Sequence, residues 1–140
     1  MISDQKETSL ARIAVLGAGG GLRSFAPAAV LAARGAGPFP GPARFIAWGA
    51  AAGEIIADKQ PDMGSRWAKR GLTLRLGSCL LAGHELAGVP GAAVCASVAL
   101  ATAYAGSQLR ARVPAGVGAR IAGGAAEDVL SYVLVAAATA

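Results

Sequence analysis

Charged residues are scarce in this 140-residue sequence, at 15% against roughly 25% in an ordinary soluble domain. Hydrophobic residues make up 54%, and alanine and glycine supply more of the apolar character than leucine, isoleucine or phenylalanine. An alanine-rich soluble protein would share this composition. The uncharged runs, however, are too long and too many for so small a domain to bury. The composition therefore favours one integral membrane domain over residues 1–140.

Aromatic residues, cysteine and histidine are also rare, and their scarcity argues against particular kinds of site. Aromatics make up 5%, and the basic residues lie between apolar runs, so the net charge of +5 fits anionic lipid headgroups better than nucleic acid. The two cysteines, Cys79 and Cys95, fall inside apolar segments without a histidine at metal-ligand spacing. We interpret them as small buried side chains rather than a disulfide or a metal site.

The first twelve residues, "MISDQKETSLAR", mix both signs of charge and lack a small-residue cleavage site behind a compact apolar core. They do not resemble a cleaved signal peptide.

Five apolar runs dominate the rest of the chain, and about 20 predominantly apolar residues suffice to cross a bilayer. The runs cover residues 10–33, 45–57, 72–88, 89–109 and 121–140, and only the fourth is both long and uncharged. The sequence predicts an all-α membrane bundle of about five transmembrane segments. Helix breaks are expected near Pro27, Pro90 and Pro114, because proline removes a backbone donor and disfavours helix in the residue before it.

The distribution of basic residues predicts the orientation. With five passes and a cytoplasmic N-terminus, only Arg34 and Arg44 among the loop lysines and arginines fall outside. The positive-inside rule therefore predicts a bacterial cytoplasmic (inner) membrane protein with its N-terminus inside and its C-terminus outside.

Pairs of glycines four residues apart predict where helices approach closely. Lipid tails are as apolar as leucine, so membrane helices associate through close backbone contact at small residues. Gly17 with Gly21, and Gly49 with Gly53, have this spacing. We expect each pair to mark a packing face, either within one chain or between the subunits of a homodimer.

The second half of the chain repeats features of the first. Both "LRSFAPAAVLAAR" (22–34) and "LRARVPAGVGAR" (109–120) place Leu-Arg four residues before a proline and ten or eleven before another arginine. Each is followed by a small-residue run ending in an acid. An offset of three passes would give the copies opposite orientations, as in the inverted repeats of many transporters.

Several stretches resemble a family of small bacterial integral membrane proteins catalogued as domain of unknown function 4126. They are "GLRSFAP", "GEIIADKQPDMGSR", "LTLRLGS", "YAGSQLRARV" and "AAEDVLSY". The resemblance implies membrane residence but no particular activity. It also implies a recurrent polar set: Arg23, Glu54, Asp58, Lys59, Arg66, Arg75, Arg110, Glu127 and Asp128.

Charged residues inside apolar segments are the candidate functional site. Each costs roughly 2.5–3.5 kcal/mol at mid-membrane, so we expect Arg23 and Arg110 to pair with the acids. An ion-pair cluster with a purely structural role stays open. The candidate ligand-binding residues are Arg23, Glu54, Asp58, Lys59, Arg110, Glu127 and Asp128, with no cofactor or metal.

Three function classes fit these residues. The first is a transporter or channel for an ion or small polar solute, with the cluster as its site. The second is an anionic-lipid-binding or assembly protein that holds headgroups through Arg66, Trp67, Lys69 and Arg70. The third is a membrane enzyme acting on lipid phosphates. It is disfavoured because no nucleophile lies beside a base, and His84 with Glu85 is expected to be a solvated pair.

Overall fold

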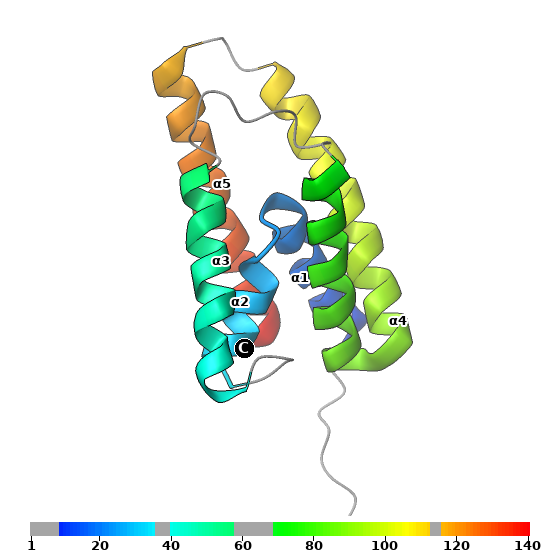
Figure 1. The fold of residues 1–140 in the computed structure, drawn as a ribbon. Helices are drawn as coiled ribbons and strands as arrows, with labels where there is room; N and C mark the ends of the chain where they lie inside the picture. Colours follow the sequence, from blue (N-terminus) through cyan, green and yellow to red (C-terminus); the bar gives the residue numbers. More distant parts are fainter. Residues whose placement is uncertain (1–8, 36–39, 58–68, 113–115) are drawn as a thin grey trace, which may run out of the picture.

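The computed structural model describes residues 9–35, 40–57, 69–112 and 116–140, and these are almost entirely helical. No strand occurs among them. The elements are α1 (Leu10–Leu22), α2 (Ala26–Ala33), the short 3-10 turn η1 (Gly41–Ala43), α3 (Arg44–Ala57), α4 (Lys69–Ala111) and α5 (Val117–Thr139). The predicted all-helical architecture is confirmed (Figure 1).

The first apolar run folds back on itself. Arg12, near the start of α1, lies beside Ala137 and Ala138. Arg34, which directly follows α2, donates hydrogen bonds to the carbonyls of Ala136 (3.2 Å) and Thr139. Both ends of the α1–α2 segment therefore lie at the C-terminal end of α5, and Figure 1 shows α1 leading away from that end and α2 returning to it. Residues 10–33 form a helical hairpin, and the prediction that they form one pass is wrong.

A second hairpin is built into α4. Its helical geometry fails at Ala87 (φ −150°, ψ 25°) and Gly88 (φ 63°, ψ −152°). The positive φ at Gly88 suits glycine, which has no Cβ to clash. Pro90 follows in the first turn of the second arm, where its missing N–H leaves no intrahelical bond unmade. The predicted division between the third and fourth runs is thus confirmed, and α4 consists of two antiparallel arms.

The helix ends gather at two ends of the bundle (Figure 1). The C-terminal ends of α3 and α4 and the N-terminal ends of α4 and α5 lie at one end. The start of α1, the end of α2, the bend at Ala87–Gly88 and the C-terminus lie at the other. The predicted topology put the N-terminus opposite the C-terminus. In the structure, α1 begins at the end where α5 finishes, because the first run is a hairpin and not a pass.

Helix α1 lies at the centre and packs against both arms of α4 and against α5. Its Ile13 and Leu16 are fully buried. A Cβ on Gly17 would meet the carbonyl of Cys95, and a Cβ on Gly21 would meet that of Ala99. The close approach predicted for this glycine pair is confirmed. Gly49 and Gly53 of α3 have no atom within 4 Å of an added Cβ, so they do not pack within the described part of the chain.

The inverted repeat is not confirmed. Gly17 faces Cys95 and Gly21 faces Ala99, so α1 runs in the same direction as the second arm of α4. These are the two helices that carry the Leu-Arg motifs, and an inverted copy would run the opposite way.

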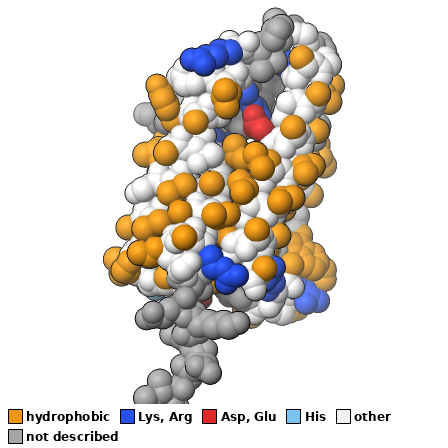
Figure 2. All heavy atoms as spheres, turned by 180° about the vertical axis from the view of Figure 1, so that it is seen from behind, with side chains coloured by type: hydrophobic (Ala, Val, Ile, Leu, Met, Phe, Trp, Pro, Cys, Tyr) orange, Lys and Arg blue, Asp and Glu red, His pale blue; other side chains and the backbone are white. Residues whose placement is uncertain are grey.

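Two stretches have the length and composition of membrane spans: Gly71–Ala111, which contains both arms of α4, and Gly118–Thr139. Large apolar side chains along them point outward, among them Leu81, Leu100, Val129 and Val133. The face seen in Figure 2 is covered by apolar side chains along its length, and lysine and arginine side chains lie toward its two ends.

Candidate functional site: the apex of the α1–α2 hairpin

The turn between α1 and α2 consists of Arg23, Ser24 and Phe25. Arg23 is extended (φ −136°, ψ 126°), and its N–H donates the last α1 hydrogen bond to Gly19 at 3.0 Å. Pro27 lies in the first turn of α2, where it cannot donate to the carbonyl of Arg23 and its ring would clash with it. The helix break predicted near Pro27 is therefore present, and it reverses the chain.

Glu54 of α3 caps the second half-helix. Its Oε1 accepts a hydrogen bond from the Ser24 N–H at 2.8 Å, and its Oε2 accepts one from the Phe25 N–H at 3.0 Å. Phe25 is the N-cap residue of α2 and has no capping side chain of its own. Helix N-termini leave backbone donors unpaired and carry partial positive charge, so a carboxylate is favourable there. Glu54 supplies it from a neighbouring helix.

Arg23 occupies the C-terminal side of the same turn and is 1% exposed. Its guanidinium forms a salt bridge with Asp128 and donates to the carbonyl of Gly124 at 3.4 Å. A cation at a helix C-terminus is favourable because the last carbonyls carry partial negative charge. Asp128 lies midway along α5, so the apex lies well inside the bundle and not at its surface.

A second ion pair, between Arg110 and Glu127, lies at the C-terminal end of α4. Arg110, at the end of α4, donates to both carboxylate oxygens of Glu127, from Nε at 2.7 Å and from a terminal nitrogen at 2.5 Å. The side chains of Arg110 and Glu127 are 33% and 19% exposed, so this pair is far more open than Arg23. Because Glu127 and Asp128 are consecutive, α5 links the hairpin apex to the end of α4.

The structure thus brings together Arg23, Glu54 and Asp128, with Arg110 and Glu127 beside them. Arg23 and Arg110 each pair with an acid, as expected, but Glu54 binds backbone N–H groups instead of an arginine. Asp58, Lys59, Arg66 and Trp67 lie outside the described residues. Lys69 and Arg70 begin α4, and their side chains are not described. Arg75 is buried in the first arm of α4.

Sequence reasoning missed two contributors to the apex. Tyr132 lies within electrostatic range of Arg23, Glu54 and Asp128. The backbone of Ser24 and Phe25 supplies the donors that hold Glu54. The position of Tyr132 one helical turn after Asp128 could have indicated it, because residues four apart share a helix face. Nothing in the sequence indicates which backbone groups would be left for Glu54.

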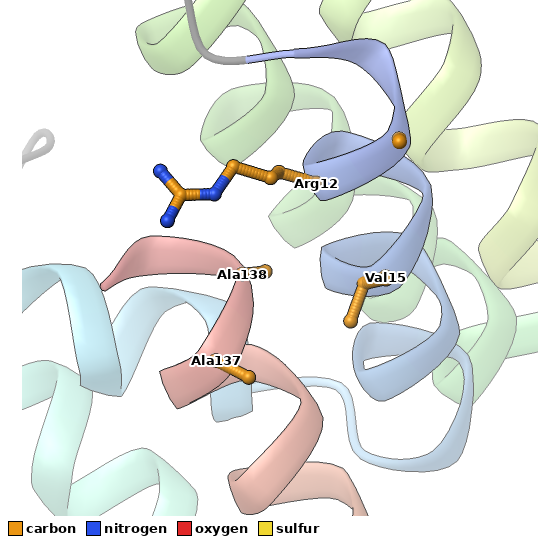
Figure 3. A pocket seen from close by; sticks show the side chains of 5 residues that line it. Arg12, Val15, Ala137 and Ala138 are labelled. Atoms are coloured by element: carbon orange, nitrogen blue, oxygen red, sulfur yellow. The ribbon is translucent and has the colours of Figure 1, made fainter.

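The cysteines lie in the core, as expected. Cys79 and Cys95 are free and fully buried, and their thiols contact each other across the two arms of α4. A recess of about 190 Å³ between α1 and α5 is lined by Ala11, Arg12, Val15, Ala137 and Ala138, with Arg12 reaching across it (Figure 3). It lies at the opposite end of α1 from Arg23 and contains none of the predicted site residues.

The chain matches no protein-family model, no curated protein and no solved structure.

The exposure of the Arg110–Glu127 pair predicts a modest role in stability. Arg110→Lys is expected to lower the free energy of unfolding by about 1 kcal/mol, since lysine cannot reproduce the two parallel hydrogen bonds and the pair is partly screened by solvent. Chemical denaturation in detergent would measure the change. The exposed Arg112 is the matched control, and Arg112→Lys should have no effect. Equal losses at both positions would contradict a specific role for the pair.

Proposed function

We propose that the protein resides in the bacterial inner membrane and transports or conducts a small ion or polar solute through a site at the hairpin apex. The observation that carries this proposal is the broken helix: two half-helices end at Arg23–Phe25, inside the bundle, against charged side chains from α3 and α5. Transporters use discontinuous helices in this way, because half-helix ends bind ligands near the bilayer midplane.

Helix lengths support a re-entrant hairpin. At 1.5 Å per residue, the 13 residues of α1 extend about 20 Å and the eight residues of α2 about 12 Å. Neither reaches across a hydrocarbon core of about 30 Å. Non-helical backbone at such depth is tolerated where protein surrounds it or where it lines a water-filled cavity, and α3, α4 and α5 surround this apex.

The outer surface supports membrane residence. Ile46 and Ile56 of α3, Leu109 of α4 and Val129 of α5 are among the exposed large apolar side chains. Monomeric soluble proteins rarely expose apolar surface that continues over several helices.

The positive-inside rule applied to this fold changes the orientation of the N-terminus. Lys69, Arg70, Arg110, Arg112 and Arg120 belong to one end, against Arg12, Arg34 and Arg44 at the other. We therefore propose that the first end is cytoplasmic. The start of α1 then lies outside, together with the C-terminus.

This topology makes a direct prediction. In a variant with Cys79 and Cys95 replaced by alanine, single cysteines at Ser9, Gly35 and Ala140 should react with an impermeant maleimide added to intact spheroplasts. Cysteines at Arg112 and Gly116 should react only after lysis. Labelling of Ser9 and Gly35 from opposite sides would contradict the hairpin and restore five passes. Labelling of every site from outside would contradict a membrane-spanning fold.

The transport proposal is tested with purified protein in vesicles of phosphatidylethanolamine and phosphatidylglycerol. Efflux of KCl, or swelling in glycerol, urea or neutral amino acids, should exceed that of empty vesicles, and Asp128→Asn should reduce it. Glu85→Gln, which removes an exposed acid near the bend of α4, is the control and should leave it unchanged. The proposal fails if no tested ion or solute moves and Asp128→Asn alters only the melting temperature.

A lipid-binding or assembly protein without transport is the second candidate, and the N-terminal end of α3 favours it. There the Arg44 guanidinium lies 5.3 Å from the ring centre of Phe45 and 5.7 Å from that of Trp48. All three side chains are exposed. Aromatic rings beside a cation are typical of the membrane interface, where the arginine can hold an anionic headgroup. This candidate predicts lipid-dependent stability and no flux.

A homodimer remains a prediction under either function. The glycine face of α3, Gly49 and Gly53, has no neighbour among the described residues and permits close approach of another helix.

A further inference from the structure

We propose that the recess between α1 and α5 is a binding site for one anionic phospholipid, whose acyl chain lies against its apolar walls and whose phosphate is held by Arg12. This inference rests on the membrane residence proposed above and is independent of transport. It assigns a partner to a part of the bundle that lies at the opposite end of α1 from the hairpin apex.

The walls of the recess suit a hydrocarbon chain. Ala11 and Val15 line it from α1, Ala137 and Ala138 line it from α5, and its volume is about 190 Å³. Ala138 belongs to the core, whereas Ala11 and Ala137 are exposed, so the recess has a buried floor and opens at the surface of the bundle. Water in such a space finds few hydrogen-bond partners, and an acyl chain needs none.

Arg12 supplies the only charged side chain that lines the recess. Figure 3 shows it extending from α1 across the recess toward the last turn of α5. Arginine side chains near helix ends lay their aliphatic part along apolar surface and keep their charge at the membrane interface. The recess therefore joins an apolar space to a cation, and these two features match the acyl chain and the phosphate of a phospholipid.

A second arginine at the same end of α5 provides a contrast. Arg34 donates hydrogen bonds to the carbonyls of Ala136, at 3.2 Å, and Thr139, so the chain itself engages that guanidinium. Arg12 is exposed, and within the described residues its guanidinium pairs with no acid and no carbonyl. Of the two arginines beside the last turn of α5, Arg12 is the one available to an external acceptor.

The charge of this end of the bundle favours an anionic lipid over a zwitterionic one. Arg12, Arg34 and Arg44 lie there, and among the described acids only Glu85, near the bend of α4, lies with them. Basic pockets between membrane helices are typical sites for anionic headgroups. A soluble phosphate would gain only the attraction of Arg12, whereas a lipid also buries its chain against the alanine and valine walls.

Native mass spectrometry of the purified protein in mild detergent tests the headgroup contact. The probes are phosphatidylglycerol, phosphatidylcholine with the same acyl chains, and glycerol phosphate. One phosphatidylglycerol should bind saturably and more tightly than the other two. Arg12→Gln should weaken it about fivefold, the contribution expected of one arginine near an anionic lipid. Arg120→Gln, which removes the same charge from the other end of α5, is the matched control and should leave the affinity unchanged.

A second pair of variants tests the acyl-chain contact without a change of charge. Ala137→Phe should fill the recess and weaken phosphatidylglycerol binding, whereas Ala101→Phe, on the exposed face of the second arm of α4, should not. Both alanines are exposed, so both variants should fold, which the melting temperatures of the lipid-free proteins check. If Ala137→Phe does not fold, the comparison of Arg12→Gln with Arg120→Gln decides the proposal.

Four results would overturn the lipid site. They are equal weakening by Arg12→Gln and Arg120→Gln, weakening by Arg44→Gln with none by Arg12→Gln, full binding by a folded Ala137→Phe, and glycerol phosphate binding as tightly as the lipid. The second of these would assign the lipid to the aromatic rings of α3. Failure of the site is distinct from failure of membrane residence. A protein that stays soluble without detergent and retains no lipid would overturn both, whereas a detergent-dependent protein that does not prefer phosphatidylglycerol would overturn only the site.

Discussion

Replacement of Arg23 by methionine is expected to lower the free energy of unfolding by about 3–5 kcal/mol, which is the usual cost of breaking a buried ion pair by removing one partner. Arg23 is 1% exposed, and its guanidinium holds both Asp128 and the carbonyl of Gly124. Methionine fills similar volume but leaves the carboxylate of Asp128 without its cation in a low-dielectric site. Denaturation of the purified protein in mixed micelles measures the loss.

A double variant separates the charge from the packing. Buried ion pairs replaced on both sides by apolar residues of similar size are often neutral or stabilising. Arg23→Met combined with Asp128→Leu should therefore recover most of the stability that Arg23→Met loses. It should not recover transport, because the charges at the apex are gone. A double variant no more stable than Arg23→Met would show that Arg23 acts through its backbone position or its bond to Gly124, and not through the salt bridge.

The helical content and the second hairpin could be predicted because local residues determine them. The uncharged run 89–109 allows only a buried or lipid-facing helix, and Gly88 with Pro90 supplies both the positive φ and the helix start that a sharp reversal needs. The close approach at Gly17 and Gly21 followed from their spacing alone. In each case the decisive residues lie within one or two turns of the feature.

The first hairpin could not be predicted because its cause is not local. Residues 10–33 have the length and hydropathy of one pass, and a proline within a membrane helix often produces only a kink. The reversal at Arg23–Phe25 depends on Glu54, thirty residues away from Ser24, to satisfy the donors it exposes. It also depends on Asp128, from the last helix, to hold Arg23. The hydropathy of residues 10–33 does not indicate which distant residues will pair with the turn.

The same long-range dependence explains the repeat. The two Leu-Arg motifs are similar over a few residues, but Arg23 is enclosed by three helices while Arg110 is a third exposed at a helix end. Similar short sequences reached different environments because their neighbours differ. Segments rich in alanine and glycine have few large side chains, so they make few specific contacts that would give two similar sequences the same structure.

The break between α1 and α2 explains why three charged residues, Arg23, Glu54 and Asp128, lie together inside this apolar chain. A continuous helix satisfies its own backbone, whereas a broken one exposes donors on one side and acceptors on the other. Glu54 meets the donors, Arg23 lies at the acceptors, and Asp128 neutralises Arg23. The break creates a polar site inside an apolar bundle, and these charged side chains stabilise it by pairing with the exposed backbone groups and with one another.

The position of the apex depends on how closely α1 approaches α4, and Gly21→Leu should disrupt it. A side chain at Gly21 would meet the backbone carbonyl of Ala99 and the Cβ of Thr102 at 2.8 Å. Backbone atoms cannot rotate away as a side chain can, so we expect a loss at or above the upper end of the usual overpacking range, about 3 kcal/mol or more. Displacement of α1 would also shift Arg23, two residues on, away from Asp128.

Gly53→Leu is the matched control, because no atom of the described part of the chain lies within 4 Å of a Cβ added there. It should leave the stability of the monomer unchanged in denaturation experiments. If α3 forms a dimer interface, Gly53→Leu should instead reduce the mass measured in mild detergent. Equal stability of the Gly21 and Gly53 variants would mean that α1 can withdraw from α4 at little cost, and the apex would not be a rigid site.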